Sequence, residues 1–300
     1  MKKPFKPMGG CNIDLDKLKY PVYVSIKVDG IRTNIYEGLC RTKSLKPLAN
    51  VYTRNLLESL PVMANLEAEL TTTTDLTDSE CFNKATSAFM THKGVPAMFI
   101  WIFDAILEGV PFEKRYEYLL SIRDKLPANA RVMHQEKCDT RGQLEVLIAL
   151  SVANNYEGLM VRHHDSLYKF GKATVTKGEL LKVKPMEDAE AIIEGFEEGT
   201  NNLNPKVTNE LGRSKRSSSK SGKVPSGMVG TVLGRHPEWG IVRISGMKDD
   251  VALDMMKLPE KYLGKIVTFK YQAHGTLEAP RLAKYKGIRS PDDLSLPEEE

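Results

Sequence analysis

A lysine beside a tight turn is the first residue whose type and position could do chemistry. The segment SIKVDGIR, residues 25–32, places Lys27 two residues before Asp29. An Asp-Gly pair between alternating residues is typical of a β-hairpin, in which Lys27 would be a solvated strand residue. A lysine held at fixed depth in a cleft could instead be a nucleophile, once nearby cations or a dry pocket free its amine. The segment alone leaves both interpretations open.

Two acidic residues alternate with apolar ones in NLEAEL, residues 65–70. With the strand period of two, Glu67 and Glu69 share one face while Leu66 and Leu70 take the other. The acids could face solvent on an edge strand. One of them could also accept hydrogen bonds from a sugar hydroxyl.

A short, almost wholly apolar segment, FIWIFDAI at 99–106, contains one acid. Phe99, Trp101 and Phe103 share a face, which favours a protein core, although a purine could stack on the ring nearest a cleft. Asp104 needs a partner, either structural or metal, because a buried carboxylate without one is destabilising.

The segments YEGLMVR at 156–162 and ELLKVKP at 179–185 carry charges on strand-like patterns. Glu157 falls on the apolar face of its segment, so it either pairs with a buried base or helps hold a metal ion. Lys182 and Lys184 share one face and repel one another unless an anion such as a triphosphate lies between them. The alternative for the lysine pair is a solvated basic face.

The elements that must position these residues predict two domains. Helical spacing at 50–60, 114–125 and 143–154 mixes with strand-like segments through about residue 185. We therefore expect an α+β domain with antiparallel sheets at 1–186. The composition changes at Pro185, which we take as the hinge to a second domain at 187–300.

The second domain has five strand candidates, at 191–196, 227–233, 240–244, 265–271 and 281–287, and a short helix at 249–256. Such a set predicts a small OB-fold β-barrel. A polar insert, about 200–226, separates the first two strands and contains five basic residues without an acid in RSKRSSSKSGK. A loop of this kind is either functional or disordered.

Composition narrows the class of protein. The chain has 300 residues, a hydrophobic fraction of 41%, a charged fraction of 27% and a net charge of +4, which indicates a globular protein of two domains. Four scattered cysteines without a CxxC pair argue against a zinc knuckle and predict reduced thiols in a cytosol-like compartment. We expect no signal peptide, no membrane span and a frayed acidic tail at 291–300.

The order of these motifs resembles the covalent nucleotidyltransferases, the superfamily of ATP-dependent DNA ligases, RNA ligases and capping enzymes. The similarity covers nearly the whole chain and is greatest to the minimal two-domain DNA ligases of viruses and phages, of the Chlorella-virus type. The motifs at 212–224 and 280–289 are typical of the DNA ligases and distinguish them from the capping enzymes. The matching segments are KVDGIR (27–32), RT (41–42) with KPL (46–48), EAEL (67–70), ATSAFMTHK (85–93), WIFD (101–104), YEGLMVR (156–162), LYKFGK (167–172), LLKVK (180–184), GRSKRSSSKSGKV (212–224) and PRLAKYKGIR (280–289).

The resemblance implies an antiparallel-sheet, ATP-grasp-like nucleotidyltransferase (adenylation) domain followed by the OB-fold domain, with a DNA-clasping latch in the insert. It also implies roles by position. Lys27 takes AMP from ATP, Glu69 binds the ribose and Phe103 stacks on adenine. The remaining implied contacts are Glu157 and Asp29 to metal, Lys182, Lys184, Arg32 and Arg281 to the nucleotide and its phosphates, and Arg41, Thr42, Lys172, Arg213, Lys215, Arg216, Lys220 and Lys223 to DNA.

Two positions depart from the family pattern. Ala68 stands where the family has glycine, so Glu67 could compete with Glu69 for the ribose. Ala283 and Lys284 stand where the family commonly has proline and an apolar residue, which leaves the role of Arg281 open.

The implied reaction seals a 5′-phosphate/3′-hydroxyl nick in duplex DNA by three in-line displacements, through a lysyl-AMP and a DNA-adenylate, with Mg²⁺ or Mn²⁺. We expect a cytoplasmic monomer, or one in the host cytoplasm if the chain is viral. The alternatives are an RNA ligase or capping-type nucleotidyltransferase, and a non-enzymatic OB-containing nucleic-acid binder. An NAD-dependent ligase would need further domains for which 300 residues leave no room.

Overall fold

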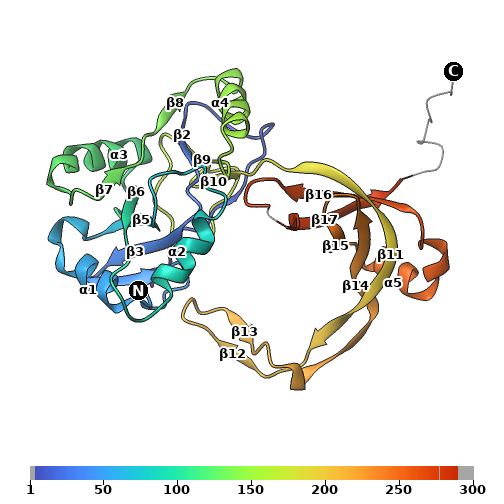
Figure 1. Ribbon diagram of the computed structural model, residues 1–300. Helices are drawn as coiled ribbons and strands as arrows, with labels where there is room; N and C mark the ends of the chain where they lie inside the picture. Colours follow the sequence, from blue (N-terminus) through green and yellow to red (C-terminus); the bar gives the residue numbers. More distant parts are fainter. Residues whose placement is uncertain (1–3, 277, 290–300) are drawn as a thin grey trace. The chain divides into compact units, whose positions relative to one another are not determined.

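The computed structural model describes residues 4–276 and 278–289, so the expected acidic tail lies outside the described residues. The chain divides into two compact units, Met1–Pro185 and Met186–Glu300 (Figure 1). Both mix helices with mainly antiparallel strands, which confirms the predicted α+β class. No helix among the described residues combines the length and the apolar character needed to cross a membrane.

The first unit contains two five-stranded sheets. We call them the lysine sheet, which carries the segments around Lys27 and Lys182, and the aromatic sheet, which carries Phe103. Among the strand pairs of the described residues in this unit, only β1–β10 and β6–β7 are parallel. In order across the sheet, the lysine sheet contains β1 (Cys11–Asn12), β10 (Leu181–Val183), β9 (Leu159–His163), β2 (Val22–Ile26) and β8 (Glu136–Cys138), and the aromatic sheet contains β4 (Leu39–Thr42), β3 (Ile31–Tyr36), β5 (Leu66–Thr71), β6 (Phe99–Ala105) and β7 (Ala130–Val132).

Helices cover the apolar face of each sheet. Leu57 of α1 (Val51–Ser59), Phe89 of α2 (Cys81–Phe89) and Leu119 of α3 (Phe112–Ser121) pack into the core of the aromatic sheet. Each such fully buried side chain stabilises the fold by about 1.5–3 kcal/mol. Asn50 caps α1 by accepting a hydrogen bond from the Thr53 amide. The helices predicted at 50–60 and 114–125 are confirmed, while α2 was not predicted.

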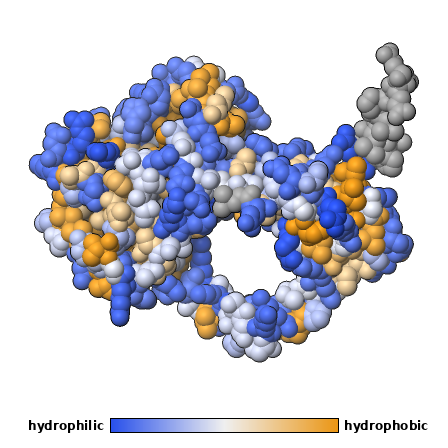
Figure 2. Space-filling model, viewed as in Figure 1, coloured by the Kyte–Doolittle hydropathy of each residue, from blue (hydrophilic) through white to orange (hydrophobic). Residues whose placement is uncertain are grey.

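The third predicted helix, α4 (Arg141–Ala153), covers the lysine sheet. It begins with a capping box between Thr140 and Gln143, and Leu144 packs against the sheet. Its opposite side is apolar as well. Val146 is 59% exposed and Leu150 is 50% exposed, and Figure 2 shows apolar side chains at the surface over this helix.

The strands around Asp29 and Gly30 do not form a hairpin, and that interpretation of the segment is wrong. Ile26 pairs with Leu159 in the lysine sheet, whereas Ile31 pairs with Leu70 in the aromatic sheet. Residues 27–30 therefore cross from one sheet to the other. A Cβ atom at Gly30 would lie 2.3 Å from the Leu70 carbonyl oxygen, so the crossing requires glycine.

In its described residues, the second unit contains a five-stranded antiparallel sheet, a two-stranded sheet and one α-helix. A parallel bridge between Ser245, just after β15, and Lys284 of β17 joins the two outer strands. This closure, with the helix between the third and fourth long strands, favours a small, partly open OB-fold barrel. All five predicted strands and the helix are present, the first two strands being longer than predicted. In order they are β15 (Gly240–Ile244), β14 (Lys223–His236), β11 (Glu187–Asn202), β16 (Ile266–Gln272) and β17 (Arg281–Ile288), with α5 (Asp249–Lys257).

The polar insert is ordered, so the disordered alternative is wrong. β11 and β14 continue their pairing to Asn202 and Lys223, and the tip pairs β12 (Lys206–Thr208) with β13 (Ser214–Arg216). The buried Asn204 side chain donates hydrogen bonds to the carbonyl oxygens of Ser217 and Ser219 at 3.2 and 2.9 Å. Side-chain hydrogen bonds thus replace the apolar core that this segment lacks.

Candidate active site

Lys27 lies at the point where the chain leaves the lysine sheet. Its backbone N–H donates to the Gly158 carbonyl oxygen at 2.9 Å, and its side chain is 18% exposed. The Nζ atom is hydrogen-bonded to Oε2 of Glu157, 130 residues further along the chain. The structure therefore holds Lys27 in an ion pair at a fixed position, rather than on a solvated hairpin.

Glu157 is the centre of this cluster. It lies just before β9 and is 2% exposed, and its other oxygen accepts a hydrogen bond from Lys184 Nζ at 2.6 Å. Burial alone would raise the pKa of Glu157, but the two ammonium groups outweigh it and hold that pKa below its usual value. The carboxylate thus stays ionised although it is buried. The sequence predicted that Glu157 would either pair with a base or help to hold a metal ion. In the structure two lysines, Lys27 and Lys184, are its partners.

The turn next to Glu157 depends on a glycine. Gly158 has φ +147°, and a Cβ atom there would lie 2.1 Å from the Val183 carbonyl oxygen. The glycine that follows Glu157 in YEGLMVR is therefore a packing requirement, because the chain approaches β10 closely at this point.

Lys182 adds a third cation beside the cluster. Leu181 and Val183 are buried while Lys182 and Lys184 point to the other face of β10, as predicted from the alternation. Burial, followed by the charges of Lys184 and Lys27, lowers the pKa of Lys182. An anion bound here would relieve this repulsion, so the lysine pair is a candidate phosphate site.

Glu69 lies on β5 of the aromatic sheet, beside the segment 27–30 that connects the two sheets. Burial raises the pKa of Glu69 to about 7; Lys27 and Arg32 oppose the shift, and the charges of Glu157 and Asp29 add to it. The carboxylates of Glu69, Glu157 and Asp29 are thus close enough to interact with one another around Lys27. Oxygen donors of this kind suit Mg²⁺, so the residues present fit a divalent cation.

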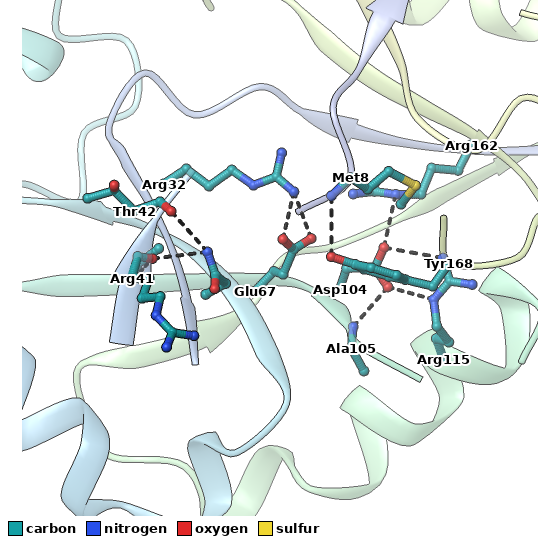
Figure 3. Close-up of polar contacts among 12 residues, drawn as sticks. Met8, Arg32, Arg41, Thr42, Glu67, Asp104, Ala105, Arg115, Arg162 and Tyr168 are labelled. Atoms are coloured by element: carbon teal, nitrogen blue, oxygen red, sulfur yellow. Dashed lines mark hydrogen bonds and ion pairs between the residues drawn. The ribbon is translucent and has the colours of Figure 1, made fainter. Parts of the chain in front are cut away.

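Glu67, the competitor of Glu69, is fully buried and already engaged. Its two oxygens accept hydrogen bonds from Arg32 Nη2 at 2.7 and 2.8 Å (Figure 3). Burial raises the pKa of Glu67, although the Arg32 charge opposes the shift. The pairing with β6 is irregular between Glu67 and Ala68. Among the described residues, Glu69 is the half-buried acid of this strand and Glu67 the structural one.

Two guanidinium groups lie near the Phe103 ring. Arg32 Cζ is 5.2 Å and Arg162 Cζ 5.6 Å from the ring centroid, within the range of cation–π contacts. The ring is half-buried on the same face of β6 as Trp101. The two guanidinium groups therefore anchor the ring while part of its surface stays accessible.

The sequence left open whether Asp104 pairs with a structural residue or with a metal ion. In the structure its partners are arginine side chains. Its carboxylate is fully buried and accepts hydrogen bonds from Arg115 at 2.7 and 3.2 Å, while Arg162 Nε lies 3.6 Å away (Figure 3). Burial lowers the pKa of Arg162 to about 10, although Asp104 opposes the shift. The sequence interpretation missed Arg115 and Arg162. Helical spacing could have found Arg115, because it shares the buried side of α3 with Phe112 and Leu119.

The remaining predicted residues do not join the Lys27 cluster. Arg41 and Thr42 lie on β4 at the edge of the aromatic sheet, and Lys172 is exposed beside Gly9. Lys43, which was not predicted, follows β4; burial and the charges of Arg32 and Lys182 lower its pKa.

The other predicted contacts belong to the second unit. Arg281 begins β17 and donates to the His274 carbonyl oxygen at 3.3 Å. Arg216 is half-buried and donates to the Asn204 carbonyl oxygen. The other four predicted insert cations are exposed, namely Arg213, Lys215, Lys220 and Lys223.

A lysine held by a buried acid among further lysines, on the crossing between two mainly antiparallel sheets, fits a lysine-dependent nucleotidyltransferase. The family model described as "ATP dependent DNA ligase domain" matches residues 6–184, more than half of the chain. The chain belongs to the ATP-dependent DNA ligase family, and it is an ATP-using ligase of nucleic acid.

Solved structures agree with this fold. Chlorella virus DNA ligase-adenylate is 24% identical, covers 95% of this chain and 98% of its own, and has a TM-score of 0.52. A Lig E DNA ligase is 20% identical over 95% and 100% of the two chains, with a TM-score of 0.70. A third structure, Pmar-Lig_Pre, is 17% identical over 95% and 67%, with a TM-score of 0.71. The comparison with curated proteins gave no match.

Proposed function

We propose that this DNA ligase seals 5′-phosphate/3′-hydroxyl nicks in duplex DNA through AMP bound to Lys27. The observation that carries the proposal is the contact of Lys27 with Glu157, which Lys184 shares. The cluster combines a nucleophile, an acid able to hold a metal ion and cations able to hold phosphate. The first unit would thus be the adenylation domain and the second the DNA-binding OB-fold domain.

In the first step, Lys27 Nζ attacks the α-phosphorus of ATP. The N–P bond forms, the bond from the α-phosphorus to the bridging oxygen breaks, pyrophosphate leaves and Nζ loses two protons to solvent. Lys182 and Lys184 neutralise charge that develops on the α-phosphate. Lys27 leaves its ion pair with Glu157 for this step, so Glu157 acts as the holder that presets the position of Nζ.

The next two steps transfer AMP to the nick and then close it. The 5′-phosphate oxygen of the nick displaces Lys27 from AMP, and the 3′-hydroxyl oxygen then displaces AMP from that phosphate. The outcome is one new phosphodiester, free AMP and regenerated lysine.

Glu157 and Asp29 would hold a divalent cation, Mg²⁺ or Mn²⁺, with Glu69 near them. When bound, it would supply charge neutralisation on the phosphates. Glu69 would otherwise accept hydrogen bonds from the ribose hydroxyls, and Phe103 would stack on adenine with Arg32 fixed beside the ring by Glu67. Arg281 would orient the pyrophosphate from the second unit.

DNA contacts would come from both units. Arg41, Thr42 and Lys172 would contact the nick and its flanking phosphates. The exposed cations of the insert would clasp the duplex through its phosphates, an interaction that needs no base sequence. The monomeric state and the cytoplasmic location stay predictions from the sequence.

The test is incubation with Mg²⁺ and ATP labelled at the α-phosphate, followed by denaturing electrophoresis. Wild-type protein should retain the label and Lys27→Ala should not, while Lys17→Ala, an exposed lysine paired with Asp14, should label normally. Label on Lys27→Ala would refute the assignment of the nucleophile.

The acceptor is tested separately, with nicked duplex DNA, nicked RNA and RNA 5′ ends offered to the pre-labelled enzyme. AMP transfer to nicked DNA should be the fastest. Preference for either RNA substrate would support an RNA ligase or a capping-type enzyme instead.

A further inference from the structure

Two adjacent histidines and an aspartate lie at the end of β9 that is remote from Lys27. β9 pairs with β2 from Leu159–Ile26 to His163–Val22, and Lys27 follows Ile26. His163 is therefore about 13 Å along the strand from the level of Ile26, and further still from Lys27, at about 3.3 Å per residue. None of the steps above uses this cluster.

The three side chains converge. His163, His164 and Asp165 each offer one ligand atom, and these atoms all lie within 4.8 Å of one another. His163 Nδ1 is hydrogen-bonded to Asp165 Oδ1, and the two imidazole rings are 4.8 Å apart at an angle of 49°. Ligands of a tetrahedral zinc ion, with bonds of about 2.0–2.2 Å, lie on the order of 3–4 Å from one another. Small side-chain rotations would bring the donors to that spacing.

Three backbone hydrogen bonds hold the segment that carries the cluster. The His163 amide donates to the Gly178 carbonyl oxygen at 2.9 Å, and the His164 amide donates to that of Pro21 at 3.3 Å. The His164 carbonyl oxygen accepts from the Glu113 amide at 2.9 Å. Because the chain is ordered before any ion arrives, binding costs little conformational entropy.

The cluster is also open to solvent. The His163 side chain is 16% exposed and that of Asp165 67% exposed, so an ion can enter and water can complete its coordination. Two imidazoles with one carboxylate suit zinc, nickel or copper, whereas Mg²⁺ prefers oxygen ligands throughout.

We propose that His163, His164 and Asp165 form a transition-metal site, with Zn²⁺ as the representative ion, separate from the divalent cation of the nucleotide phosphates. The ion would tie the end of β9 to the turn that follows it. Its main effect would be on the stability of the first unit, because an ion that binds only the folded state raises the unfolding temperature.

The chain contains a matched control. His134 and Glu136 form another histidine–carboxylate pair two residues apart, with Nε2 and Oε2 3.1 Å from one another, and its histidine is 80% exposed. No second histidine adjoins that pair in the sequence. His134→Ala therefore removes a similar hydrogen bond without touching the proposed site.

The experiment is calorimetric titration of the metal-stripped full chain with Zn²⁺ in excess Mg²⁺. Wild type and His134→Ala should bind one ion per chain with micromolar affinity or better, and zinc should raise their unfolding temperatures. His164→Ala and Asp165→Asn should each weaken binding by about tenfold or more. Both should unfold at the wild-type temperature in EDTA, which shows that they are folded.

Absence of zinc uptake by the wild type at micromolar concentrations would overturn the proposal, as would unchanged affinity in His164→Ala and Asp165→Asn. Replacement of zinc by Co²⁺ tests the ligands directly. The absorption spectrum should lack a thiolate-to-cobalt charge-transfer band, and such a band would assign the ion to cysteine instead.

Discussion

The charged side chains around Lys27 are largely buried and paired, whereas those of the polar insert are largely exposed. The two environments suit different tasks: a reaction at phosphorus in the first case and binding of a polyanion in the second. In the first unit, Glu157, Glu67 and Asp104 are almost wholly buried and each is paired with a cation. In the insert, the basic side chains are largely exposed. Buried pairs keep fixed geometry and are little screened by salt, whereas exposed cations are mobile and screened. Preorganised groups suit a displacement at phosphorus, and exposed groups suit a polyanion of any sequence.

The largest expected effect is on stability, from Asp104→Asn. The change leaves Arg115 and Arg162 buried without their counter-charge, which should destabilise the first unit by about 3–5 kcal/mol. Urea unfolding measures the loss. Asp124→Asn removes an ion pair in which both partners are largely exposed and should cost less than about 1 kcal/mol. Equal losses would remove the contrast between buried and exposed charge.

Glu157→Gln should have the next largest effect, on catalysis. An amide cannot neutralise Lys27 and Lys184 together, nor hold a metal ion as a carboxylate does. Label transfer from ATP to the protein should slow by about 10²–10³-fold, as for other preorganised electrostatic groups. Glu117→Gln, at a half-exposed surface pair with Lys114, is the control. A wild-type rate in Glu157→Gln would exclude Glu157 from the adenylation step.

Neutralising the exposed insert cations should change DNA binding alone. Replacement of Arg213, Lys215, Lys220 and Lys223 by serine should lower the slope of log affinity against log salt by about 0.9 for each phosphate that the protein no longer neutralises. Adenylate formation without DNA should keep its wild-type rate. An unchanged salt slope would show that the insert does not bind phosphates, and slower adenylation would contradict the division of labour.

The smallest effect concerns the pH dependence of stability through Glu69. Its pKa is raised to about 7 in the folded state, so its stabilising contribution is present in acid and is lost as pH rises from about 4.5 to about 7. Glu69→Gln cannot ionise, so its stability relative to wild type should rise by roughly 1–3 kcal/mol across that window. Unfolding in EDTA measures it, with the exposed Glu80→Gln as control. A difference independent of pH would refute the raised pKa.

Much of the architecture follows from local patterns. Alternation placed Lys182 and Lys184 opposite Leu181 and Val183, and helical spacing located α1, α3 and α4 to within a few residues. The five strands of the second unit were located from strand-like segments between turn residues, although β11 and β14 extend further than predicted. The helix α2 was missed, since its nine residues follow a polar stretch without a clear start signal.

Pairing between distant segments was not predictable in this way. The Asp-Gly turn has the local pattern of a hairpin, yet β2 and β3 join different sheets because each finds better partners in β9 and β5. The few apolar residues of the insert, such as Leu203 and Val207, are exposed and do not predict order, yet the strands of the insert extend those of the sheet beneath it. Hydrogen bonds made across long sequence separations outweigh local preference in both cases.

By itself, the sequence determined which groups are available for chemistry and in what order: Lys27, the acid pair of EAEL, Asp104, Glu157 and the lysine pair. Residue type, period and spacing are properties of the chain alone, and the resemblance to the ligases rests on them. Tertiary structure decided the partners. It gave Asp104 to arginines, Glu67 to Arg32 and Glu157 to Lys27, because the free energy of a buried charge depends on which opposite charge the fold brings within hydrogen-bonding distance.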